Sequence, residues 1–265
     1  MLKFPAISKD IKEDEYSNSC IPEYISCKII KGIGLKVQET ILGNYEEYAG
    51  EDRIVVACKD FTTKNKKLKQ FAELKNSYID ILMNGYGTEL EEIIQTIEEQ
   101  QIYDPLELKQ FFWQMFIVDA LLGNFDRHNG NWGFLIDEEN KKIEIAPIYD
   151  CGSCLYPQLT DEKMKEIINN QDEIDNRVYV FPNSAIKHND KKINYYQYIS
   201  SLENEDCNLA LSTVFPKINM ENINKIIDET PYISEIRKDF YKLIIQERYE
   251  KILKYSYNKL KKWKG

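Results

Sequence analysis

The chain has 265 residues, a net charge of −9 and an isoelectric point of about 5.0. Its 43% hydrophobic and 30% charged residues are typical of a globular protein that forms one large domain or two small lobes. The acidic balance argues against direct nucleic-acid binding, and no apolar run reaches the roughly 18 residues of a membrane span. Because no secretion signal opens the chain, we expect a cytoplasmic protein with reduced cysteines.

The first 60 or so residues predict strands around one helix. MLKFP predicts a short edge strand ending at Pro5, because proline cannot donate to a β-ladder. Residues 19–34, SCIPEYISCKIIKGIG, predict a largely buried helix that ends at its glycines. LKVQETIL (35–42) and DRIVVACKDF (52–61) predict two strands joined by the hairpin loop GNYEEYAGED.

From about residue 67 the signals are mainly helical. Residues 105–123, PLELKQFFWQMFIVDALLG, are apolar around most of the circumference, which indicates a central buried helix. Two short strands are expected at 132–136 and 142–148. Further helices are predicted at 68–83, 88–100, 161–170, 194–202 and 220–228, with a last one opened by Thr230 and Pro231. The expected class is α+β, with a small β-rich N-lobe and a larger helical C-lobe.

Polar residues are concentrated in the loop that follows the buried helix, GNFDRHNGNWGFL (123–135). Asp126 and Asn131 lie five residues apart in it, and Asp150 follows the second short strand. A short hairpin would bring Asn131 and Asp150 to the same end, where their oxygens suit Mg²⁺ together with waters and phosphates. Asp126 would then be free to accept the proton of an attacking hydroxyl. This D-x-x-x-x-N pattern with a later Asp is the working core of protein kinases; a plain polar turn is the alternative.

The motifs FDRHNGN and APIYD resemble those of the HipA-like family of bacterial serine/threonine protein kinases. VQETILG, VVACKDFTT, LLGNFDRHNGNWGFL and CGSCLYPQ extend the similarity over nearly the whole chain, most strongly to the family's branch of small cell-translocating kinases. The resemblance implies a bilobal protein-kinase-like fold, with a partial N-lobe at 1–62 and a helical C-lobe at 63–265. It also implies transfer of phosphate from ATP, with Mg²⁺, to Ser or Thr of a protein substrate, and possible targets include the kinase itself.

The resemblance assigns a role to several positions. Asp126 matches the catalytic base, Asn131 and Asp150 match the metal ligands, Lys3 matches the nucleotide lysine, and Glu23 matches the glutamate that positions it. Without the family match, Lys3 would be read as an ordinary lysine at a strand edge.

Two further groups of residues have weaker assignments. His128 is expected to orient the loop, and Arg127 to contact a phosphate or an acidic group. The segment Val56, Ala57, Cys58 and Lys59 matches the hinge, where the backbone of Ala57 to Lys59 would bind adenine.

Two departures from the family pattern keep alternatives open. HipA has a lysine just before the metal asparagine, where this chain has Gly130. No glycine-rich loop precedes Lys3, and Gly32-Ile-Gly34 reads as a helix stop. The sequence therefore predicts either an upstream start or a trimmed kinase.

Two alternative functions stay open. One is a phosphoinositide or small-molecule kinase, since the D-R-H-x-x-N loop resembles that of phosphoinositide kinases. The other is a truncated, weakly active nucleotide-binding pseudokinase.

The pair Cys151 and Cys154 forms a lone C-x-x-C motif. A zinc site would need two more ligands at suitable spacing, which the sequence does not show. We therefore expect two packed thiols in a tight turn.

Overall fold

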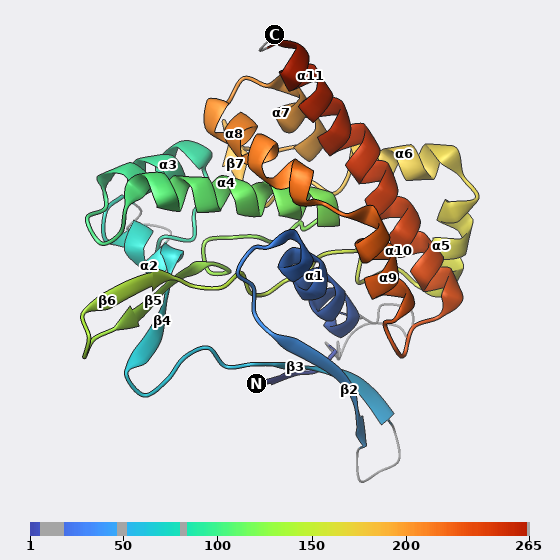
Figure 1. The fold of residues 1–265 in the computed structure, drawn as a ribbon, viewed down its shortest axis with the longest axis horizontal. Coiled ribbons are helices and arrows are strands. Elements are labelled where there is room, and N and C mark those ends of the chain that lie inside the picture. Colours follow the sequence, from blue (N-terminus) through green and yellow to red (C-terminus); the bar gives the residue numbers. More distant parts are fainter. Residues whose placement is uncertain (6–18, 47–51, 80–83, 264–265) are drawn as a thin grey trace.

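The structure, a computed structural model, describes residues 1–5, 19–46, 52–79 and 84–263. Two three-stranded sheets lie toward one side of the molecule, and most of the helices lie toward the other (Figure 1). Within the described residues no helix is long and apolar enough to cross a membrane. This segregation of strands and helices confirms the predicted α+β class.

The first sheet has the antiparallel order β1-β3-β2. Its strands are β1 (Leu2–Lys3), β2 (Thr40–Glu46) and β3 (Asp52–Cys58). As predicted, β1 is an edge strand. The strand predicted at 35–42 instead forms at Thr40–Glu46, so residues 43–46 of the predicted hairpin loop belong to β2, and residues 47–51 lie outside the described part.

Helix α1 (Cys20–Ile33) packs against β2 and β3. Apolar residues recur at helical spacing on its buried side, including Ile21, Ile25 and Ile29. The helix ends at Gly34, whose φ of 90° lies in the left-handed region that favours glycine. The predicted helix and its glycine stop are confirmed.

The second sheet, of order β4-β5-β6, corrects one prediction. The segment expected to open a helix at 68 instead forms β4 (Lys66–Gln70), and the helix α2 (Phe71–Asn76) begins after it. The alternation of KKLKQ explains the strand, because Leu68 packs against a small core cluster while its neighbours face away from it. Residues 80–83 of the predicted helix lie outside the described part. The partners β5 (Gly133–Asp137) and β6 (Lys142–Ile145) form the expected hairpin.

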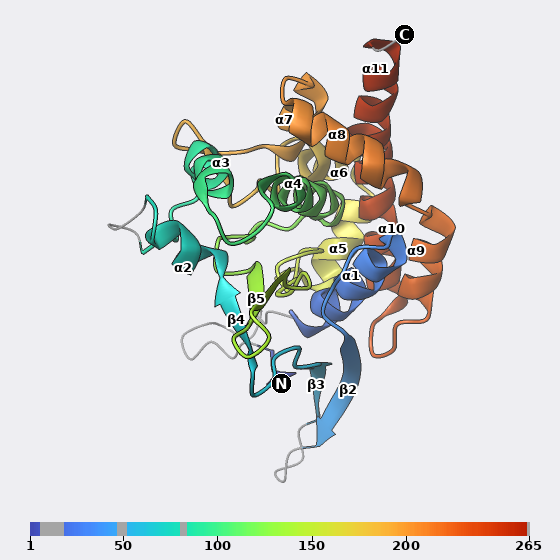
Figure 2. The same ribbon diagram turned by 60° about the vertical axis from the view of Figure 1, so that its left-hand side comes forward.

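Helix α4 (Pro105–Leu122) is the centre of the helical part, and eleven of its residues are buried. It packs against α3 (Leu90–Glu99), α8 and α10. Figure 2 shows α4 nearly end-on, with helices on several sides. The remaining elements are α5 (Asp161–Ile168), α6 (Gln171–Tyr179), β7 (Lys187–His188), β8 (Lys191–Lys192), α7 (Tyr195–Ser201), α8 (Glu205–Val214), a 3-10 turn (Phe215–Lys217), α9 (Met220–Asp228), α10 (Glu235–Arg248), a π-helical segment (Tyr249–Lys254) and α11 (Tyr255–Trp263).

The last long helix begins later than predicted. Ser234 caps α10 by accepting a hydrogen bond from the Arg237 N–H, whereas Thr230 and Pro231 lie in the preceding turn. The serine oxygen satisfies one of the free N–H groups of the first turn. Pro231 has no side-chain oxygen and cannot cap a helix in this way. Helices α6 and α8 were not predicted.

A short backbone contact joins the two parts of the molecule. Ile148 donates its N–H to the carbonyl of Lys36 and accepts from the N–H of Gln38, at 2.9 and 2.8 Å. This contact holds the chain that follows β6 against the segment between α1 and β2. It therefore carries Asp150 to the edge of the first sheet.

Candidate active site

The loop after α4 is fixed by its own asparagines. Gly123 ends α4 with a φ of 68° and donates its N–H to Asp119. Asn124 is fully buried; its amide donates to the Asp119 carboxylate at 2.9 Å, and its Oδ1 accepts the N–H of Asp126 at 3.0 Å. The amide of Asn129 donates to the carbonyls of Gly85 and Gly87. Two of the three asparagines therefore hold the loop in place.

Asp126 presents a free carboxylate on this fixed loop. Its backbone carbonyl accepts the N–H of His128 at 2.8 Å and the side-chain amide of Asn131 at 2.9 Å. Its side chain is exposed, and no group in the described part of the chain donates a hydrogen bond to the carboxylate. A carboxylate held by its backbone and open at its oxygens is suited to accept a proton.

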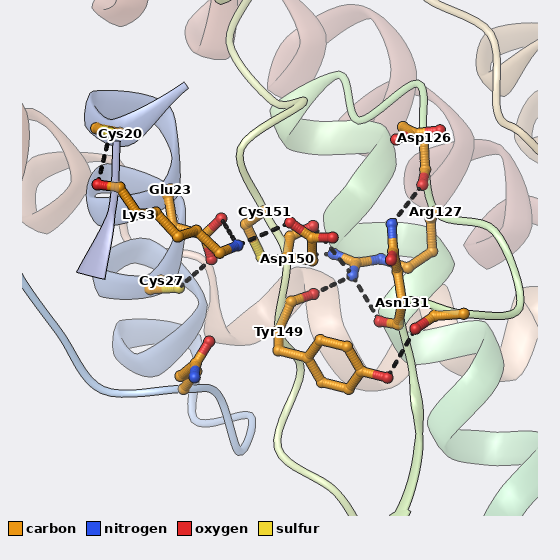
Figure 3. Close-up of polar contacts among 12 residues, drawn as sticks. Lys3, Cys20, Glu23, Cys27, Asp126, Arg127, Asn131, Tyr149, Asp150 and Cys151 are labelled. Carbon is orange, nitrogen blue, oxygen red and sulfur yellow. Dashed lines mark hydrogen bonds and ion pairs between the residues drawn. The ribbon is translucent and has the colours of Figure 1, made fainter. Parts of the chain in front are cut away.

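Arg127 has a different role from the predicted contact with a phosphate. Its guanidinium is buried and pairs with the carboxylate of Asp119, with Nε 3.0 Å from Oδ2. It also donates to the carbonyls of Asn131, Tyr149 and Asp150 (Figure 3). Arg127 instead forms the other contact that the sequence predicted, an ion pair with an acidic group, which is Asp119. Arg127 therefore ties the loop to the segment that carries Asp150.

The two predicted metal ligands lie on either side of this arginine (Figure 3). The amide nitrogen of Asn131 is held by the Asp126 carbonyl, so its Oδ1 is directed away from that bond. Asp150 is half-exposed and has a φ of 57°. A left-handed backbone is unfavourable for aspartate and is often found at functional sites. The side-chain oxygens of both residues are the type of donor that Mg²⁺ prefers.

Lys3 is held between two carboxylates. Its Nζ lies 2.9 Å from Oε2 of Glu23 and 2.8 Å from Oδ1 of Asp150. Burial alone would lower the pKa of Lys3, but the two carboxylates outweigh it and raise that pKa above its ordinary value. Lys3 is therefore a positively charged side chain that two ion pairs hold in place. Burial raises the pKa of Glu23, and Lys3 opposes this rise.

The backbone predicted to bind adenine is already used within the protein. The N–H groups of Cys58 and Lys59 donate to the carbonyls of Met1 and Glu39, both at 2.8 Å. Their carbonyls accept from the Met1 amino group and from the Gln38 side chain. The prediction fails because β3 is the central strand of its sheet, where both sides of the backbone are paired. The side chains of Val56 and Cys58 share a face with Lys3, since Lys3 pairs with Val56.

His128 orients the loop, and Gly130 makes room for it. Nδ1 of His128 accepts the N–H of Gly130 at 3.0 Å. The ring of Tyr86 lies edge-on to that of His128, with centroids 6.0 Å apart. A Cβ on Gly130 would lie 2.9 Å from carbons of both rings. This crowding explains why glycine replaces the lysine of the family pattern.

We expect Gly130→Ala to lower the free energy of unfolding by roughly 1–3 kcal/mol, the usual cost of overpacking. The double variant Gly130→Ala with Tyr86→Ala removes one of the two clashing rings and should recover part of this loss. Denaturant unfolding of the single variants and the double variant measures both effects. If the losses of unfolding free energy in the two single variants simply add in the double variant, position 130 is not crowded by the ring of Tyr86.

Sequence reasoning missed three residues that build the site. Asp119 is the buried partner of Arg127 and lies on α4, seven residues before Asp126. Tyr149 donates its hydroxyl to the carbonyl of Gly130 at 2.9 Å. Asn129 anchors the loop to the segment before α3. Asp119 could have been found, because a charged residue in such an apolar helix implies a buried partner.

The chain resembles known proteins over nearly its whole length. The model of the HipA-like C-terminal domain matches residues 1–230. The chain is 48% identical over 254 residues to serine/threonine-protein kinase CtkA of Helicobacter pylori, covering 96% of this chain and 77% of that protein. The crystal structure of the Helicobacter pylori proinflammatory kinase CtkA matches with a TM-score of 0.93 and 46% identity, covering 99% of this chain and 88% of the other.

A more distant match shows the fold alone. A chain from the Shewanella oneidensis toxin–antitoxin complex of HipA, HipB and operator DNA has a TM-score of 0.56 and 17% identity, covering 91% of this chain and 57% of the other. The family model and the similarity to CtkA confirm the resemblance inferred from the sequence motifs. The chain therefore belongs to the family of HipA-like C-terminal domains.

Proposed function

We propose that the chain is a serine/threonine protein kinase that transfers the γ-phosphoryl group of ATP, with Mg²⁺, to a hydroxyl of a protein substrate. The observation that carries the proposal is the linked set of contacts around Asp150. Lys3, itself paired with Glu23, contacts Asp150 from one side, and Arg127 joins it to Asn131 and the Asp126 loop from the other. The family and the name of the H. pylori relative support the same activity.

Each side chain of this set has a separate task in the proposed reaction. The free carboxylate of Asp126 accepts the proton of the attacking Ser or Thr hydroxyl. Lys3, steadied by Glu23, offers its positive charge to the phosphates. Oδ1 of Asn131 and the carboxylate of Asp150 would hold Mg²⁺, which when bound neutralises negative charge on the phosphates.

The adenine would lie near the connection between the two sheets. Because the backbone of Cys58 and Lys59 is already paired, the next residues, 60–65, are the better candidates for the hinge. This segment joins β3 to β4 and therefore spans the two parts of the molecule.

The test is a transfer assay with radiolabelled ATP and Mg²⁺ on two acceptors, a mixture of generic proteins and phosphoinositide vesicles. We expect label on Ser and Thr of the proteins or of the chain itself, no label on the lipid, and loss of the signal when a chelator removes Mg²⁺. Label on lipid would favour the phosphoinositide-kinase alternative. A rise in Tm with ATP and Mg²⁺ but no transfer to any acceptor would favour the pseudokinase.

A further inference from the structure

A second group of potential ligands lies beside the lysine that contacts Asp150. One carboxylate oxygen of Glu23 and the sulfurs of Cys27 and Cys151 all lie within 4.8 Å of one another. Glu23 and Cys27 are one turn apart on α1, so they face the same side of the helix. Cys151 comes from the chain directly after Asp150. The structure thus places two further ligands beside Cys151, which the sequence alone could not show.

We infer that Glu23, Cys27 and Cys151 form a binding site for a thiophilic divalent cation such as Zn²⁺. Two thiolates and a carboxylate are an established type of zinc ligand set. Thiolates select against Mg²⁺, so this site is chemically separate from the Asn131–Asp150 pair. Binding Zn²⁺ displaces the two thiol protons into solution and forms bonds from zinc to both sulfurs and to the carboxylate. No oxidant or reductant is needed.

The surroundings suit the charge of such a site. Two thiolates and one carboxylate carry three negative charges, and Zn²⁺ offsets two of them. The guanidinium of Arg127 lies 3.4 Å from the sulfur of Cys151. This fixed cation stabilises the charge that remains.

The buried site has a route of entry. A pocket of about 330 Å³ between α1 and the β2–β3 hairpin is lined by Cys27 and Cys58, so an ion can approach the sulfur of Cys27 from that side. A metal bound there draws Glu23 away from Lys3 and weakens nucleotide binding; this consequence, unlike the site, rests on the proposed function.

The test uses full-length protein, kept reduced and stripped of metal, and titrated with Zn²⁺ against a chromophoric chelator. Cys27→Ser and Cys151→Ser are compared with Cys207→Ser, a matched control because Cys207 is equally buried but lies on α8. The wild type and the control should bind one Zn²⁺ per chain, and the two site variants should bind at least about 10-fold more weakly. Co²⁺ should give a thiolate charge-transfer band in the wild type and the control, and a weaker band in the site variants.

Glu23→Gln provides a second test in case the cysteine variants do not fold. It should lower the affinity for Zn²⁺ by at least about 10-fold and keep the Co²⁺–thiolate band. Wild-type protein without stoichiometric Zn²⁺ binding, or equal affinity in Glu23→Gln and Cys207→Ser, would overturn the site. Because these readouts measure metal and not phosphate transfer, they remain valid if the kinase proposal fails. Zn²⁺ binding that leaves the affinity for an ATP analogue unchanged would overturn the regulatory consequence alone.

Discussion

Replacing Asp126 by Asn is expected to lower the rate of phosphoryl transfer by about 10²–10⁴-fold. The amide cannot accept the proton of the attacking hydroxyl, and the surrounding loop has no second carboxylate that takes its place. The side chain is exposed and free of hydrogen-bond donors in the described part of the chain. The substitution should therefore leave the fold and the affinity for nucleotide nearly unchanged. Single-turnover transfer and calorimetric titration with an ATP analogue separate these two effects.

The control for this experiment is Asp228→Asn, which removes one charge from a partly exposed ion pair between α9 and α10, remote in sequence from the loop. It should transfer phosphate at the wild-type rate. If Asp126→Asn transfers phosphate as fast as the control, Asp126 is not the base. If Asp126→Asn loses as much affinity for nucleotide as it loses rate, Asp126 acts in nucleotide binding and not as the base.

Replacing Asp119 by Asn is expected to lower the free energy of unfolding by roughly 3–5 kcal/mol, because it leaves the buried charge of Arg127 without a partner. Asp119 and Arg127 are both buried, and the carboxylate accepts two hydrogen bonds from the guanidinium and one from Asn124. For a domain of this size each kcal/mol lowers Tm by roughly 2–4 °C. The variant should also transfer phosphate more slowly below its Tm, since Arg127 holds the chain at Asn131 and Asp150.

The matched substitution is again Asp228→Asn, whose partner Lys242 is partly exposed. An exposed pair contributes about 0–1 kcal/mol, so this variant should unfold close to the wild type. Denaturant or thermal unfolding of both variants gives the comparison directly. Similar losses for the two would mean that the Asp119–Arg127 pair does not organise the loop.

The sequence predicted best those parts in which one segment determines its own structure. The apolar circumference of 105–123 predicted the central helix α4, and the glycine at 34 marked the end of α1. The pattern of Asp126, Asn131 and Asp150 predicted a shared site because hairpin geometry limits where these residues can lie. Arg127 contacts the backbone of both Asn131 and Asp150, while the shared site and its catalytic roles remain proposals.

The features that sequence reasoning missed depend on partners far along the chain. β4 forms a strand because β5, more than 60 residues later, offers it an edge. The backbone of Cys58 is occupied because Met1 pairs with it, and Arg127 is buried because Asp119 and the Tyr149 segment surround it. Helical or turn propensity at a residue contains no information about such partners. For the same reason, the sequence could not show that Cys27 and Glu23 lie beside Cys151.

The most direct test of the proposed site is a crystal structure of the chain with a non-hydrolysable ATP analogue and Mn²⁺ in place of Mg²⁺. We predict an anomalous manganese peak that contacts both Oδ1 of Asn131 and the carboxylate of Asp150, with Lys3 turned from Asp150 to a phosphate and Asp126 facing the γ-phosphate. A nucleotide bound elsewhere, or manganese that touches neither Asn131 nor Asp150, would contradict the account.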